Sequence, residues 1–276
     1  MAGPIRLRLF SGPDSIKPIE AWPAEAAERL YHREAFRKQS RAAPLEPFTR
    51  EWFEQIETYR YSRQGAWLPK MLEFSRHRGD IVLGLGEGLG TDWLQYARHG
   101  AHVIACSESH EQLGLIERNF RLREQEIRVA HAPPNVLPFD GSSVDVVCIQ
   151  GLLHEVERPE LVIEEVYRIL RPGGKVIAVA PARFDAAYWH ARLFPWRRWF
   201  SRAKPGAPRG TTARHLKRDF ARFGDRVVKK RHLRRSHLPQ LWRPFPLALL
   251  ERFLGQFLII KGFKPLSAAL AAQVAA

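Results

Sequence analysis

The chain alternates short apolar runs with longer segments in which apolar residues recur at helical spacing. Continuous apolar runs are typical of strands buried on both faces of a parallel sheet, and apolar positions three and four residues apart are typical of amphipathic helices. Strands are predicted over Asp80–Leu85, Ala101–Cys106, Ile127–His131, Val144–Ile149 and Lys175–Ala180. Helices are predicted over Leu89–His99, Ser109–Glu124 and Pro159–Leu170, the last stopped by Pro172, Gly173 and Gly174. This alternation predicts βαβ units and a doubly wound α/β fold.

The two ends of the chain depart from this alternation. Residues 1–47 are rich in proline and have no clear period, so we expect an N-terminal arm with a short helix near Glu25–Lys38. Helical spacing from Phe48 to Phe74 predicts leading helices for a core over residues 48–181. Residues 182–276 are expected to form an aromatic and basic cap, the last strands and an Ala-rich tail. Within that unit we expect one helix and two strands, over Thr212–Phe223, Arg226–Arg234 and Phe257–Phe263.

Charge is distributed very unevenly. The 276 residues include 44 Lys and Arg against 29 Asp and Glu, which gives a net charge of +15. The segment from Arg183 to Arg235 contains 17 basic and 3 acidic residues and so carries +14, which leaves the rest nearly neutral. A localised basic segment suits nucleic acid, anionic lipid or an acidic substrate. The overall composition, 45% apolar and 26% charged, excludes wholesale disorder.

The number of cysteines and the length of the apolar runs indicate the cellular compartment of the protein. Cys106 and Cys148 are too few for a disulfide framework and lie in apolar runs, so we expect buried, reduced thiols. The first residues contain no apolar run of the kind found in secretory signals, and the longest nearly apolar stretch, Phe253–Ile260, is too short for a membrane span. We therefore expect a cytoplasmic protein, soluble or peripheral on the inner face of a membrane.

A glycine-rich turn, VLGLGEGLGTD over residues 82–92, follows the first predicted strand. Gly86, Gly88 and Gly90 allow a ligand to approach the backbone closely, and the next helix offers free N–H groups at its start. Such a turn also fits a plain strand-to-helix connection. Its place after the first strand of a doubly wound sheet favours a ligand site, because ligands bind there beyond the carboxyl ends of the strands.

Five blocks in order along Tyr59–Pro181 resemble the class I S-adenosylmethionine-dependent methyltransferases, and among them the type-11, ubiquinone/menaquinone-methyltransferase-like group. The blocks are VLGLGEGLGTD (82–92), GAHVIACSES (100–109), LPFDGSSVDVV (137–147), GLLHEV (151–156) and EVYRILRPGGK (165–175). The resemblance implies a Rossmann-like, mostly parallel seven-stranded sheet with an antiparallel last strand pair. It also implies S-adenosyl-L-methionine as cofactor. The segment after Pro181 would add a helical and aromatic insertion to this fold.

Three positions depart from the family's pattern. Gly84 and Ser107 stand where the family usually carries acidic residues, the second of which accepts hydrogen bonds from the ribose. The family often has an Asp near Pro133 that contacts the adenine. Loss of three charge-assisted hydrogen bonds would cost about 4–9 kcal/mol of cofactor binding. Three neighbouring side chains offer compensation: Glu87, Glu108 and Asn135.

Glu108 can replace the ribose ligand only if the second strand has ended before it, because neighbouring strand residues face opposite ways. The full set of expected cofactor residues is Gly84, Gly86, Glu87, Gly88, Gly90, Asp92, Ser107, Glu108, Asn135, Val136 and Gln150. His154 is the candidate base for a hydroxyl acceptor, with Glu155 beside it, since both follow a strand at the sheet's carboxyl edge. A helix-entry histidine bonded to backbone fits the same position. We expect no metal site.

Three functions fit these observations. The first is O- or C-methylation of a small-molecule or lipid-like acceptor near an anionic membrane, because aromatic residues alternate with arginine over Tyr188–Phe200. The second is RNA methylation through the basic 183–235 segment, with Lys229–Arg235 as the RNA contact; those residues alternate too poorly for a purely structural strand. The third is a non-catalytic scaffold with a weakened cofactor site. The aromatic segment also fits a lid over the acceptor pocket.

Overall fold

The structure is a computed structural model that describes residues 27, 45–62, 65–193, 210–233, 238 and 244–266. The predicted helix near Glu25–Lys38 lies outside the described residues, apart from Ala27, which is helical and buried. The end of the aromatic segment Tyr188–Phe200 and the Ala-rich tail also lie outside them.

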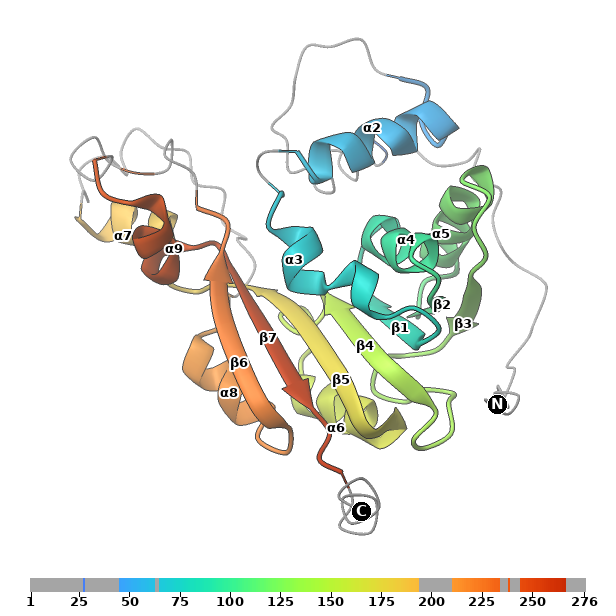
Figure 1. Cartoon of the computed structure of the whole chain (residues 1–276). Coiled ribbons are helices and arrows are strands. Elements are labelled where there is room, and N and C mark those ends of the chain that lie inside the picture. Colours follow the sequence, from blue (N-terminus) through green and yellow to red (C-terminus); the bar gives the residue numbers. More distant parts are fainter. Residues whose placement is uncertain are drawn as a thin grey trace.

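A seven-stranded sheet with the order β3-β2-β1-β4-β5-β7-β6 runs through the molecule (Figure 1). Its strands are β1 Ile81–Gly86, β2 His102–Ser107, β3 Arg128–His131, β4 Val144–Gln150, β5 Leu170–Pro181, β6 Gly224–Arg231 and β7 Phe257–Phe263. The first five strands pair in parallel, whereas β7 is antiparallel to both β5 and β6. The predicted doubly wound, mostly parallel sheet with an antiparallel last pair is therefore confirmed.

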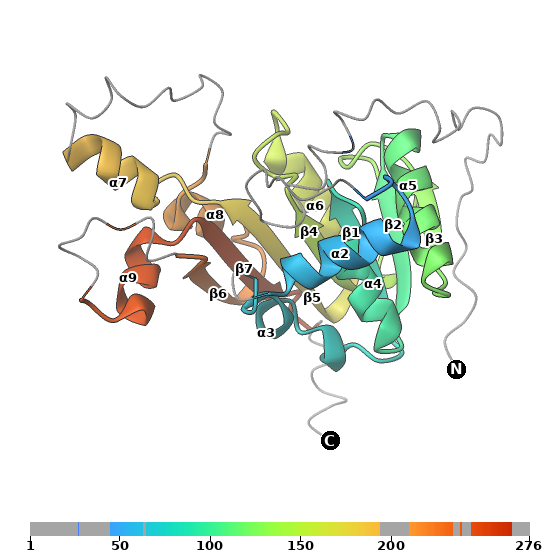
Figure 2. The same ribbon diagram turned by 90° about the horizontal axis from the view of Figure 1, so that it is seen from above.

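Helices cover both faces of the sheet, with α3 and α4 on one side and α6 and α8 on the other (Figure 2). The helices are α2 Arg50–Arg60, α3 Leu68–Leu72, α4 Thr91–Arg98, α5 His110–Leu122, α6 Pro159–Ile169, α7 Ala186–Leu193, α8 Ala213–Asp219 and α9 Leu247–Leu254, with a short 3-10 turn at Phe74–Arg76. Strand β1 shows why both faces are buried: Val82 packs into one apolar cluster, and Leu83 and Leu85 pack into the other. Such burial requires the continuous apolar run seen in the sequence.

Helix α2 packs against α5 and is paired through Glu57 with Arg98 of α4. Its residues Trp52, Phe53 and Ile56 pack with Leu89 and Leu115 in a separate buried cluster. This apolar contact places α2 directly against the glycine-rich turn. The helix α5 begins where predicted, since Ser109 caps it and accepts a hydrogen bond from the Gln112 N–H at 3.2 Å.

One prediction about the later elements was wrong. Helix α6 ends at Ile169, and β5 begins at the next residue, so Pro172, Gly173 and Gly174 lie inside that strand and do not form the stop signal. The strand accommodates them through a left-handed Gly173 (φ +81°), whose N–H donates to the Lys264 carbonyl at 2.8 Å. The strand expected over Arg226–Arg234 is present as β6, in which Lys229–Arg231 pair with β7 at the sheet edge.

Candidate functional site

The carboxyl ends of β1 and β4 bring most of the predicted site residues to one edge of the sheet. Gly86 and Gln150 are register partners there, and the Glu87 N–H donates to the Gln150 carbonyl at 3.1 Å. The chain winds from β1 toward β3 in one direction and from β4 toward β5 in the other. The glycine-rich turn therefore lies at the point where the winding reverses, where doubly wound sheets bind ligands.

Two glycines of the turn are required by the backbone. Gly86 has φ +119°, and a Cβ atom added there would lie 1.8 Å from the Gln150 carbonyl oxygen. Gly90 has φ +71° at the N-cap of α4, and its added Cβ would lie 2.9 Å from the Ile116 side chain. A side chain at either position would move the turn.

Packing also explains why glycine stands at position 84, within β1. A Cβ atom added there would lie 2.3 Å from the Trp93 indole, which covers this face of the strand. The indole thus occupies the space that an acidic side chain would need. Gly84 therefore offers no side chain to a ligand.

Asp92 is held in a buried ion pair with Arg60 from α2. The Arg60 Nε and Nη2 atoms lie 2.7 and 2.5 Å from the two carboxylate oxygens, and the side chains are 8% and 3% exposed. The Tyr61 hydroxyl donates to Asp92 at 2.6 Å, and Arg60 Nη2 also donates to the Gln150 side chain at 3.2 Å. Burial opposes ionisation of Asp92, but Arg60 and Tyr61 outweigh it and hold the pKa of the carboxyl below its usual value. Asp92, at the start of α4, and Gln150, at the end of β4, are therefore both bonded to Arg60, which fixes the two ends of the turn to α2.

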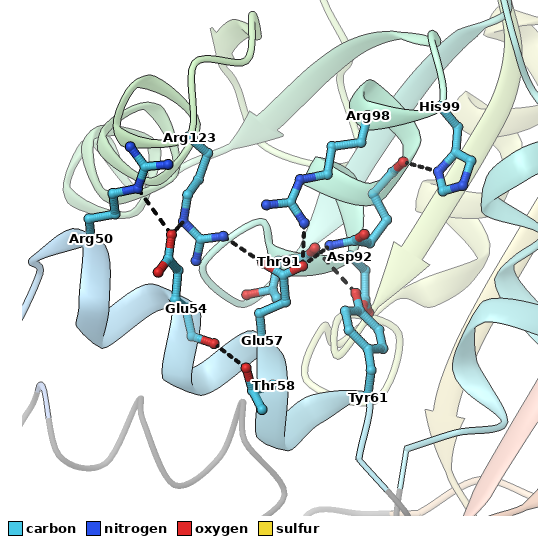
Figure 3. A network of polar contacts seen from close by, with 11 residues as sticks. Arg50, Glu54, Glu57, Thr58, Tyr61, Thr91, Asp92, Arg98, His99 and Arg123 are labelled. Carbon is cyan, nitrogen blue, oxygen red and sulfur yellow. Dashed lines mark hydrogen bonds and ion pairs between the residues drawn. The ribbon is translucent and has the colours of Figure 1, made fainter.

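A second polar cluster fastens α2 over the turn (Figure 3). Glu57 of α2 pairs with Arg98 of α4 and with Arg123 at the end of α5, where the Nη1–Oε2 distance is 2.6 Å. Gln95 Nε2 donates to the same carboxylate at 2.8 Å. Helix α2 is thus held by ion pairs to α4 and to the end of α5, the helices that follow β1 and β2.

Arg60, Tyr61 and Glu57 were not predicted from the sequence as part of the site. One signal was present, because Trp52, Ile56 and Arg60 fall on one face of α2 at four-residue spacing. An arginine on an apolar helix face needs a buried partner. The partner itself is 32 residues away, and no local pattern indicates it.

Ser107, at the end of β2, is already hydrogen-bonded within the protein. Its hydroxyl donates to Gln112 Oε1 at 2.8 Å and accepts from the Ser109 N–H at 3.1 Å. Gln112 in turn donates to the carbonyls of Gly86 and Gly88 at 2.8 and 3.2 Å. Gln112, which the sequence analysis missed, therefore fastens the turn to the end of β2.

Glu108 lies just beyond the end of β2, so the condition for it to serve as a ribose ligand is met. Its side chain is exposed, and the described part of the chain offers its carboxylate no partner. Asn135 and Val136 are also exposed, in the turn after β3, where the Val136 N–H donates to the Pro133 carbonyl at 3.1 Å. Glu108 is thus a carboxylate available to a ligand at this edge.

His154 lies in the turn after β4, and its side chain is 9% exposed. Nε2 lies 3.6 Å from Glu155 Oε1, and the buried Nδ1 has no hydrogen-bond partner among the described residues. The described backbone thus offers no bond to Nδ1, which counts against the alternative of a histidine bonded to backbone. Burial lowers the His154 pKa below its usual value against the opposing charge of Glu87, so the imidazole is neutral at pH 7.

The two cysteines are buried in β2 and β4, as predicted. Burial raises the pKa of each thiol to about 12, so neither is a nucleophile at neutral pH. In the described ranges, no group of three or more His, Cys, Asp or Glu side chains is placed to hold a metal ion.

Residues 81–178 match a family model described as a methyltransferase domain, the type-11 form. This stretch is a type-11 methyltransferase domain. The match confirms the resemblance seen in the sequence blocks, and the family supports S-adenosyl-L-methionine as the cofactor.

Curated relatives of the methyltransferase domain are demethylmenaquinone methyltransferases. Those of Clavibacter sepedonicus and Paenarthrobacter aurescens (strain TC1) are 34% and 35% identical over 99 residues, which is 36% of this chain. The same residues cover 40% and 38% of the two relatives. The chain thus spans less than half the length of these relatives.

Solved structures show the same fold over more of the chain. A SAM-dependent methyltransferase from Aquifex aeolicus has a TM-score of 0.53 at 13% identity, covering 78% of this chain and 97% of that one. The [4+2]-cyclase SpnF has a TM-score of 0.54 at 16% identity, covering 83% and 85%. At such identities the likeness shows the fold alone.

Proposed function

We propose that the chain is an S-adenosylmethionine-dependent methyltransferase that methylates a small, lipid-like acceptor at oxygen or carbon. The observation that carries the proposal is the type-11 methyltransferase domain, whose glycine-rich turn lies where the sheet reverses its winding. The demethylmenaquinone methyltransferase names of the relatives support an acceptor of the quinol class.

The residues at this edge fit the cofactor. When bound, S-adenosylmethionine supplies a methyl group on a positively charged sulfur. The backbone of the turn at Gly86 and Gly88 would hold it closely, and the unpartnered Glu108 carboxylate would accept hydrogen bonds from the ribose hydroxyls. Asn135 and Val136 would flank the adenine.

Affinity for the cofactor is expected to be weaker than in a domain with all three family acceptors. Trp93 fills the space at Gly84, and the Ser107 hydroxyl is engaged by Gln112. If Glu108 restores one of three lost acceptors, two remain lost, at a cost of about 3–6 kcal/mol. The non-catalytic scaffold is the outcome in which this cost abolishes binding.

His154 provides the base for a hydroxyl acceptor. The neutral imidazole has a lone pair available at pH 7, and the acceptor's proton moves to it as oxygen attacks. The buried Nδ1 has no hydrogen-bond partner among the described residues, which is unusual for a buried polar atom outside a functional site. A positioned base contributes about 10²–10⁴-fold to rate. We therefore expect His154→Ala to reduce turnover at least tenfold.

Transfer from methyl-labelled S-adenosylmethionine to a soluble naphthoquinol tests the proposed acceptor class, with RNA as the parallel acceptor. Label in the naphthoquinol supports the proposal. Label in RNA alone would replace it with the RNA function, and a chain that binds cofactor but labels neither acceptor would contradict the lipid-like acceptor.

A further inference from the structure

Helix α9 has two apolar faces, and only one of them is covered. Leu247, Leu250 and Leu254 pack inward with Ala186, Leu233 and Leu238. Leu249 and Phe253 form a second stripe one turn apart and are 57% and 62% exposed, and Phe245, just before the helix, is 53% exposed. A helix that is apolar on both sides is normally buried on both sides. The outward stripe is therefore a surface without its partner.

A group of exposed aromatic side chains extends this stripe from a distant part of the sequence. Phe184, Tyr188 and Trp189, at the start of α7, are 39–40% exposed, and their rings contact each other edge to face at 5.0 and 5.5 Å. Phe184, Trp189 and Phe253 also line one pocket of about 600 Å³. Of the ten large apolar side chains exposed in the described residues, six lie in these two segments.

Lys230 of β6 holds the two segments together. Its Nζ donates to the Phe184 carbonyl at 2.5 Å and to the Phe253 carbonyl at 2.6 Å. Both views place α7 and α9 at the same end of the molecule, beyond β6 and β7 (Figures 1 and 2). The α7/α9 surface, defined as Phe184, Tyr188, Trp189, Phe245, Leu249 and Phe253, is thus one continuous feature of the fold.

The charges around the α7/α9 surface are positive. Arg183 lies over the Phe184 ring at 5.8 Å, and Arg252 lines the same pocket as Phe253. Both are exposed, as is Arg192 further along α7. The acidic residues of the same segments are engaged: Asp185 accepts from the Tyr188 N–H at 2.8 Å, and Glu251 pairs with Arg231 at 2.9 Å. Exposed rings and leucines flanked by arginine match the acyl boundary and the anionic headgroups of a bilayer. A surface for RNA would offer fewer aliphatic side chains.

From these observations, we infer that the α7/α9 surface docks the protein onto an anionic lipid bilayer. Docking is interfacial: the described helices include none long and apolar enough to cross a membrane. Leu249 and Phe253 enter the headgroup–acyl boundary, and the three arginines contact lipid phosphates. This surface is separate from the glycine-rich turn, so its binding is independent of the proposed methyl transfer.

Co-sedimentation of the full chain with vesicles tests this inference. The vesicles are phosphatidylcholine alone, or phosphatidylcholine and phosphatidylglycerol in equal parts. We expect strong partition to the anionic vesicles, reduced at least tenfold by the double substitution Leu249→Ser and Phe253→Ser. Val227→Ser, at a side chain 47% exposed on β6, is the matched control and should bind like the parent chain. Because all three positions are exposed, unfolding curves should confirm that the variants fold.

Three results would overturn the inference. The first is no partition of the parent chain to anionic vesicles at low salt. The second is an unchanged partition of the double variant. The third is tight binding to single-stranded RNA that falls steeply with salt and is weakened by the double substitution as much as vesicle binding is, since that result would assign the α7/α9 surface to nucleic acid.

Discussion

The buried Arg60–Asp92 pair offers the sharpest test of how the leading helix supports the glycine-rich turn. Asp92→Asn keeps the shape of the side chain and an acceptor for the Tyr61 hydroxyl but removes the charge that balances Arg60. Both side chains are more than nine-tenths buried, so Arg60 would lose, in the interior, the carboxylate that it contacts through two nitrogens. Breaking a buried pair from one side costs about 3–5 kcal/mol. We expect a loss of that size in the free energy of unfolding.

The double variant Arg60→Met/Asp92→Asn separates a buried charge from simple lost packing. With both charges gone, much of the loss should be recovered, with a coupling energy of at least about 2 kcal/mol between the two sites. Urea unfolding followed by tryptophan fluorescence measures each variant, since the chain has 8 Trp.

Glu124→Gln is the matched control, because this carboxylate is 84% exposed and pairs at 3.5 Å with Arg50, which is itself half exposed. The control should leave the unfolding midpoint unchanged. If Asp92→Asn were no more destabilising than Glu124→Gln, or if the double variant lost the sum of both single losses, the reasoning would be refuted.

The remaining predictions concern the cofactor edge and the pH dependence of stability. Glu108→Gln should weaken S-adenosylhomocysteine binding about tenfold in calorimetry, whereas Glu111→Gln, an exposed carboxylate on the next helix, should not; equal effects would remove Glu108 from the site. Gly86→Ala should abolish that binding through its clash with Gln150, whereas Gly79→Ala, also at positive φ but with open space around its Cβ, should cost only about 1 kcal/mol of stability and leave binding intact. Burial raises the Glu73 pKa, but Lys175 and Lys261 outweigh it and hold that pKa at about 2, so the carboxylate's contribution to stability is complete above the usual 4.5 and is lost as pH falls toward 2. Glu73→Gln should therefore remove about 1–2 kcal/mol of stability that depends on pH in this range. Identical pH profiles of unfolding for the variant and the parent chain would contradict this.

The sheet and its helices were predictable because their signals are local. The strand over Phe257–Phe263 has the predicted bounds, β1 differs from its prediction by one residue at each end, and β4 differs by one residue at its carboxyl end only. Continuous apolar runs mark these buried strands. The junction at Leu170 was mispredicted because pairing with Val144 continues the strand through residues that ordinarily stop a helix. Tertiary pairing overrode local turn chemistry at that point.

The parts of the candidate site that sequence reasoning missed depend on contacts between distant residues. Gln112 meets the turn 26 residues earlier in the chain, and Arg60 meets Asp92 only because α2 folds over α4. The sequence offered Glu108 as one of three candidate substitute acceptors, on the condition that the second strand ends before it, because strand neighbours face opposite ways. Only the three-dimensional structure could show whether the Glu108 carboxylate has another partner.

The central claim is that this edge of the sheet binds the methyl-donor cofactor despite the loss of acidic residues. Isothermal titration of S-adenosylhomocysteine into the full chain measures it directly. The account predicts saturable binding of one ligand per chain, weakened by Glu108→Gln and unchanged by Glu111→Gln. No binding at millimolar ligand would contradict it and leave a methyltransferase fold without its cofactor.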